Sequence, residues 1–126
     1  MPQFEFTEEE FKHIQRAVKK LTEIRKDLSA KDWKKPQNSL VKELANKFPA
    51  DSTHERSFIL NRNCIKAILQ LTKAGLTALN GATIPAYKER IASQPDKKEF
   101  YQPYLEKAER MATVFEGLTT KLEGGL

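Results

Sequence analysis

The residues best suited to chemistry lie between positions 56 and 90, where a long apolar helical pattern carries six basic side chains and one acid. The basic residues are Arg56, Arg62, Lys66, Lys73, Lys88 and Arg90, and the acid is Glu89. A helix of this kind buries its apolar side and can present positive charge elsewhere, which favours an anionic partner. Guanidinium and ammonium groups bind phosphate or carboxylate, and nearby tyrosine rings can stack on a ring of the ligand.

A candidate ligand site follows from three polar residues, Asn61, Arg62 and Asn63, that interrupt the apolar pattern. Because successive helical residues point about 100° apart, at least one of them is expected to face inward or toward an interface. The residues predicted for the site are Asn61, Arg62, Lys66, Tyr87, Lys88, Arg90, Tyr101 and Tyr104. The alternative is structural, since a buried polar group needs partners and can form a hydrogen-bond network or fix the register of an oligomer.

Residues that could form an enzyme or metal site are scattered. His13 and His54 stand in different predicted elements without a partner at ligand spacing. Cys64 lies in an apolar run, where burial should raise the pKa of the thiol and make it a poor nucleophile. The five glycines form no phosphate-binding loop of the GxxxxGK or GxGxxG type. We therefore predict no catalytic residues, no metal ligands and no cofactor.

The function expected from these features is that of a small, non-enzymatic binding or adaptor protein. Its partner would be a nucleotide-like anionic small molecule or an acidic protein, held on the basic and tyrosine-containing surface. The alternative is a nucleic-acid-binding regulator, because 22 basic residues against 17 acidic ones give a net charge of +5. No helix-turn-helix with a short glycine-containing turn and no RNA-binding signature accompanies that charge. An enzyme is the third class considered.

The elements that must position these residues are all helical, and the pattern predicts three long and two short helices. The first follows a capping box between Thr7 and Glu10. A short helix comes after a connector at 29–38, with Asn38 or Ser39 as its cap and Pro49 as its stop. A long central helix starts with a second box between Ser52 and Glu55 and stops at Asn80-Gly81. A short helix over 84–94 and a last one from near Gln102 complete the fold, with no strand of consequence.

The predicted bundle is a single domain over 1–126, with the long central helix antiparallel to the C-terminal helix. Gly75 and Gly117 each interrupt a helical pattern at a cost of about 1 kcal/mol against alanine, so we expect the two helices to cross near this pair. A central helix of about 27 residues would span ~40 Å. That length exceeds the needs of one small domain, so self-association into a homo-oligomer is expected.

The cysteine content and the hydropathy of the sequence predict the cellular compartment. Its one cysteine, Cys64, cannot form an intramolecular disulfide and fits a reducing environment. The first residues do not combine a basic region with an apolar core, and no apolar run approaches the ~18 residues of a membrane span. We expect a cytoplasmic protein without a membrane partner.

Overall fold

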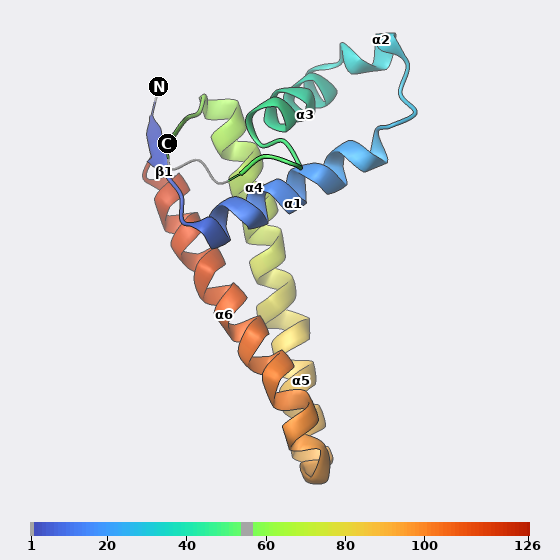
Figure 1. The fold of residues 1–126 in the computed structure, drawn as a ribbon, viewed down its shortest axis with the longest axis vertical. Coiled ribbons are helices and arrows are strands. Elements are labelled where there is room, and N and C mark those ends of the chain that lie inside the picture. Colours follow the sequence, from blue (N-terminus) through green and yellow to red (C-terminus); the bar gives the residue numbers. More distant parts are fainter. Residues whose placement is uncertain (1, 54–56) are drawn as a thin grey trace. The chain divides into compact units, whose positions relative to one another are not determined.

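The computed structural model describes residues 2–53 and 57–126 and is mostly helical (Figure 1). Its internal contacts divide the chain into two compact units. The first unit comprises residues 1–68 together with 125–126, and the second comprises residues 69–124.

The helices of the first unit begin where local signals place them. Helix α1 (Glu8–Ile24) opens with the predicted capping box, because the Thr7 hydroxyl accepts from the Glu10 N–H at 3.2 Å. The Glu10 carboxylate in turn accepts from the Thr7 N–H at 2.8 Å. A short helix α2 (Ala30–Trp33) lies in the predicted connector, and α3 (Pro36–Lys47) also begins inside it, with Lys35 at the cap position in place of Asn38 or Ser39. Pro36 suits the first helical position because its φ is already fixed and its missing N–H needs no partner there.

A small sheet makes the expectation of an all-α fold wrong in one respect. Strands β1 (Gln3–Glu5) and β2 (Ser57–Ile59) pair antiparallel, with Phe4 opposite Phe58. Both phenylalanines are buried while their neighbours in the strands are exposed, which is the two-residue period of a half-buried strand. Three residues per strand are too few for that alternation to stand out from an apolar background.

The core of the first unit is rich in phenylalanine. The rings of Phe48 and Phe58 lie 4.8 Å apart between centroids, and those of Phe11 and Phe48 lie 6.0 Å apart. Phe6 contacts both Phe48 and Phe58, at 6.3 and 5.7 Å. Each of these four side chains is at most 7% exposed. The core therefore joins α1, the end of α3 and the small sheet.

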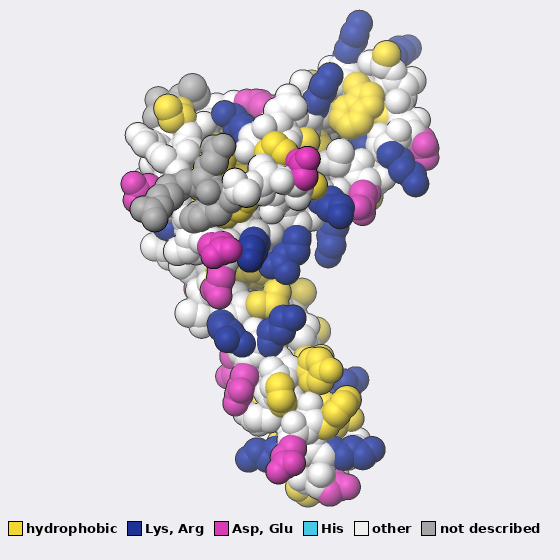
Figure 2. All heavy atoms as spheres, in the orientation of Figure 1, with side chains coloured by type: hydrophobic (Ala, Val, Ile, Leu, Met, Phe, Trp, Pro, Cys, Tyr) yellow, Lys and Arg dark blue, Asp and Glu magenta, His cyan; other side chains and the backbone are white. Residues whose placement is uncertain are grey.

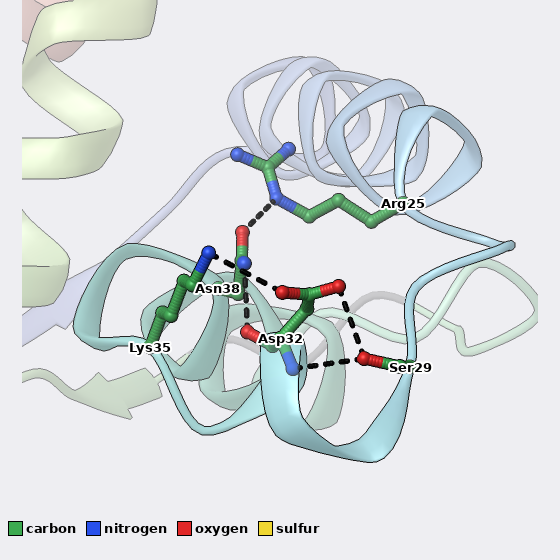
Figure 3. Close-up of polar contacts among 5 residues, drawn as sticks. All are labelled: Arg25, Ser29, Asp32, Lys35 and Asn38. Carbon is green, nitrogen blue, oxygen red and sulfur yellow. Dashed lines mark hydrogen bonds and ion pairs between the residues drawn. The ribbon is translucent and has the colours of Figure 1, made fainter.

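A polar network at the other end of α1 connects it to α2 and α3 (Figure 3). Arg25 Nε donates to Asn38 Oδ1 at 2.8 Å, and Asn38 Nδ2 donates to the backbone oxygen of Asp32 at 2.8 Å. The Asp32 carboxylate accepts from the Ser29 hydroxyl at 3.0 Å and pairs with Lys35 at 3.2 Å. These two partners, Ser29 first, lower the pKa of Asp32 below its usual value. Asn38 is thus a buried network residue and not the helix cap that its type suggests.

The central helix starts later than predicted. Helix α4 (Arg62–Ala78) begins ten residues after Ser52, and Asn61 caps it by accepting from the Cys64 N–H at 2.9 Å. The interval holds β2 and Leu60, whose apolar residues belong to the sheet and the core rather than to a helix. Glu55, the second member of the predicted capping box, lies outside the described residues, as do His54 and Arg56.

The predicted stop at Asn80-Gly81 is also wrong. A π-helical turn, η1 (Leu79–Thr83), joins α4 directly to α5 (Ile84–Ser93), and the Ile84 N–H donates to the Leu79 carbonyl. No described residue, Gly81 included, has the positive φ of a left-handed stop. Leu79 is buried in a cluster with residues of the last helix, and Ile84 packs against it. Packing of these side chains favours a wider turn over termination of the helix.

The last helix, α6 (Lys98–Glu123), starts four residues before Gln102 and contains Pro103. Within the second unit α6 runs antiparallel to the end of α4, in agreement with the predicted arrangement (Figure 1). Lys73 pairs with Glu123 at 2.9 Å, and a Cβ added to Gly75 would lie 3.0 Å from the Phe115 ring. Gly117 has no such neighbour within 4 Å, so the predicted close approach of the helices involves Gly75 alone.

Candidate functional site

The eight residues predicted for the ligand site divide between the two units. Asn61, Arg62 and Lys66 belong to the first unit. The second unit holds Tyr87, Lys88, Arg90, Tyr101 and Tyr104.

The first group surrounds the start of α4. Asn61 is half-buried, and besides capping the helix it donates through Nδ2 to the Glu43 carboxylate of α3 at 2.6 Å. Arg62 and Lys66 are exposed. Asn61 therefore stabilises the start of α4 and its contact with α3, while Arg62 and Lys66 beside it are accessible to solvent.

Among the described residues of the first unit, Cys64 and His13 have the largest changes in pKa. Cys64 is fully buried, and burial followed by the nearby Glu43 carboxylate raises the pKa of its thiol to about 11. The predicted direction of that change is confirmed. His13 is half-buried on α1, and burial together with Arg16 and Lys20 lowers the pKa of its imidazole to about 4. Both groups are therefore neutral at pH 7.

The second group forms a compact arrangement of rings around one arginine. The Tyr87 and Tyr104 rings are nearly parallel, with centroids 6.0 Å apart. The Arg90 guanidinium lies over Tyr87 at 5.8 Å and over Tyr101 at 5.9 Å. Phe100 completes the set, 5.1 Å from Tyr101 and 5.7 Å from Tyr104. We refer to Tyr87, Arg90, Phe100, Tyr101 and Tyr104 as the aromatic cluster.

Two helices and a tight connection bring these side chains together. On α5, Tyr87 and Arg90 are three residues apart and share a face, as Phe100 and Tyr104 do at four residues apart on α6. Gln94 and the 3₁₀ turn η2 (Pro95–Lys97) reverse the chain between the helices, which lie side by side in Figure 1. The proline cannot continue α5 with a regular hydrogen bond, so the reversal happens at this position.

Part of the cluster is open to solvent. Phe100 is 62% exposed and Tyr104 is 49% exposed, whereas Tyr87 and Tyr101 are half-buried. Hydrophobic side chains gather on the surface of the α5 and early α6 segment in Figure 2, with charged side chains around them. Sequence reasoning missed Phe100, although its spacing of four residues from Tyr104 was a usable signal.

The charge around the cluster is nearly balanced. Residues 84–107 contain five cations, Lys88, Arg90, Lys97, Lys98 and Lys107, against four carboxylates, Glu89, Asp96, Glu99 and Glu106. Arg90 forms no ion pair with a described residue, and Lys88 is exposed. Attraction of an anion to this surface would thus depend on the placement of single cations more than on a broad positive field.

Within residues 2–53 and 57–126, no group of three or more His, Cys, Asp or Glu side chains is placed to hold a metal ion. No helix in this part of the chain is both long enough and apolar enough to cross a membrane. Comparison with protein-family models found no match, and comparisons with curated proteins and with solved structures found none either.

Proposed function

We propose that this protein is a small, non-enzymatic binding or adaptor protein whose aromatic cluster holds a nucleotide-like anion. The observation that carries the proposal is the position of Arg90 over two tyrosine rings, next to exposed Phe100 and Tyr104. A guanidinium held in this way keeps its N–H groups for a phosphate or carboxylate, because ring faces take none of them. An exposed ring beside it can stack on the base of the same ligand.

An acidic protein segment with an aromatic residue is the second form of the same proposal. It would use the cluster in the same manner, with a carboxylate at Arg90 and a ring against Phe100. The 62% exposure of Phe100 favours this form, since an exposed ring gains most from a partner that covers a large area.

The alternative of a nucleic-acid-binding regulator rests on the same two exposed rings, which could stack on successive bases of a single strand. The balance of five cations against four carboxylates over residues 84–107 weighs against it. Nucleic-acid affinity depends strongly on neutralising many phosphates, and this surface has little net charge for that purpose.

The test is a titration with ATP, measured as a rise in melting temperature and by isothermal calorimetry. Arg90→Gln should abolish the response, and Phe100→Ser should weaken binding about five- to 150-fold, equivalent to the ~1–3 kcal/mol of one stacked base. Arg110→Gln removes an exposed arginine of α6 outside the cluster and is the matched control. Equal binding by wild type and Arg90→Gln would contradict the proposal, as would the absence of any binding.

Two further measurements test the alternative functions, a nucleic-acid-binding regulator and an enzyme. A single-stranded oligonucleotide whose affinity falls steeply and linearly with salt on logarithmic axes would favour the nucleic-acid reading. Recovery of ATP unchanged after long incubation is expected of a binding protein, and its hydrolysis would contradict the non-enzymatic assignment. Arg62→Gln and Lys66→Gln should leave ATP binding intact if the aromatic cluster alone forms the site.

Self-association remains a proposal in its own right. The exposed Phe100 and Tyr104 offer apolar surface to a second copy as well as to a ligand. Native mass spectrometry of the purified protein gives the subunit number and would reveal a retained small anion in the same spectrum. A monomer at micromolar concentration would contradict the predicted homo-oligomer.

A further inference from the structure

A second candidate site lies in the first unit, in a groove between α1 and the end of α3. The groove has a volume of about 310 Å³, at the lower end of the ~300–1,000 Å³ usual for small-molecule sites. Val18 and Thr22 of α1 line one side, and Ala45 and Phe48 line the other. Each of these residues belongs to the first unit, so the groove is separate from the aromatic cluster of the second.

The wall of the groove is suited to hydrocarbon. Val18 and Phe48 form its floor, and both are buried hydrophobic residues of the first unit, each 1% exposed. Among the described residues of the lining, Thr22 is the one that is polar and uncharged, and its hydroxyl already donates to the Val18 carbonyl at 2.7 Å. A ligand group lying against this wall finds little to bond with and must therefore be apolar.

The rim carries charge on one side. Lys19 and Glu23 project from α1, and Lys26 follows just after its end. All three are exposed, and neither lysine forms an ion pair with a described residue. Two cations against one carboxylate give this edge a net positive charge, which complements an anionic group at the end of an apolar chain.

We propose that the groove between α1 and α3 binds a single-chain amphiphile with a carboxylate head group. The chain lies against Val18, Ala45 and Phe48, and the carboxylate lies between the ammonium groups of Lys19 and Lys26. Glu23, which lines the same rim, weakens the attraction and tunes the affinity. This site is independent of the proposed function of the aromatic cluster.

Dodecanoate is the probe for this site, and dodecyltrimethylammonium and acetate are its controls. Two-dimensional ¹H–¹⁵N NMR should show saturable changes at the amides of Val18, Thr22 and Ala45 with dodecanoate below its micelle concentration. The cationic amphiphile of the same chain length should bind more weakly, and acetate should not bind. Equal binding of both amphiphiles would overturn the role of the lysines, and no saturable change would overturn the site.

Variants test the chain and the head group separately. Ala45→Phe fills the groove and should abolish dodecanoate binding, whereas Ala92→Phe places the same ring on exposed α5 and should not. Replacing Lys19 and Lys26 together by glutamine should weaken binding about two- to thirtyfold, as expected for two exposed ion pairs. Glu23→Gln should tighten it.

Three outcomes of the variant series would overturn the proposal. These are retention of binding in Ala45→Phe, loss of binding in Phe100→Ser, and a Glu23→Gln variant that binds more weakly than wild type. If the wild type does not bind dodecanoate and Ala45→Phe changes the oligomeric state, the groove is a contact between copies of the chain instead. Far-ultraviolet circular dichroism of Ala45→Phe, matched to Ala92→Phe, establishes that the loss of binding is not a loss of fold.

Discussion

Gly75 and Gly117, the two glycines within α-helices of the second unit, should respond differently to the same added methyl group. Gly117 of α6 has open space within 4 Å of a built Cβ, so Gly117→Ala gains only helix propensity. That gain is about 1 kcal/mol of unfolding free energy. Gly75 of α4 would gain the same amount, but its Cβ would lie 3.0 Å from the Phe115 ring, closer than such carbons normally approach.

The cost of this close contact decides whether Gly75→Ala stabilises or destabilises the protein. Moving the Phe115 ring within a packed cluster costs about 1–3 kcal/mol, as overpacking generally does. Gly75→Ala should thus range from neutral to about 2 kcal/mol less stable than wild type, and about 1–3 kcal/mol less stable than Gly117→Ala. Urea unfolding followed by circular dichroism at 222 nm measures both variants against wild type.

A double-mutant cycle identifies the cause. Phe115→Leu removes the edge of the ring that the new methyl group meets. In its presence the cost of Gly75→Ala should fall by at least about 0.5 kcal/mol, the lower limit for coupled neighbours. If Gly75→Ala instead stabilises the protein as much as Gly117→Ala does, Phe115 does not pack on Gly75 and the antiparallel arrangement of α4 and α6 is wrong at this point.

Two other predictions concern pH and a buried hydroxyl. The pKa of His13 is lowered from 6.5 to about 4, so the folded state keeps the imidazole neutral and stability should fall as the pH drops from about 6.5 toward 4. In urea unfolding, His13→Gln should lose that part of the pH dependence. A pKa near 6.5 for His13, measured by NMR, would contradict this prediction. Thr119 has a buried hydroxyl without a hydrogen bond to the described residues, so Thr119→Val should stabilise by about 1 kcal/mol. Thr120→Val is the control, because the hydroxyl that it removes is exposed and donates to the Glu116 carbonyl. A thermal melt in which Thr119→Val is less stable than Thr120→Val would contradict this reasoning.

Local signals predicted the parts of the fold that depend on a few neighbouring residues. The capping box of Thr7 and Glu10 is confirmed because both hydrogen bonds form within one helical turn. The stop at Asn80-Gly81 failed because Leu79 and Ile84, on either side of it, are both packed in a cluster with α6. Those contacts are remote in sequence, and no rule based on neighbours can anticipate them.

The candidate site could be predicted only in part for a similar reason. The residue types were visible in the sequence, and Tyr87 and Arg90 stand at helical spacing. Which cation meets which ring depends on the reversal at Pro95, which brings α5 against α6 and places Arg90 over Tyr101. Arg62 and Lys66 share the basic pattern along the chain, but they belong to the other unit.

The π-helical turn η1 gives the segment before the aromatic cluster room for one residue more than a regular helix would hold. A π turn accommodates one residue more than an α-helical turn, and each residue of a helix advances its face by about 100°. Removing one residue from Leu79–Thr83 would let α4 and α5 join as a regular helix. Because the wide turn absorbs that extra residue, Tyr87 and Arg90 would keep their side of α5 and stay beside Tyr101 and Tyr104. Removing a second residue would leave no wide turn to absorb the change, so the face that carries Tyr87 and Arg90 would rotate by about 100° away from these rings. The segment therefore tolerates the loss of one codon but not of two.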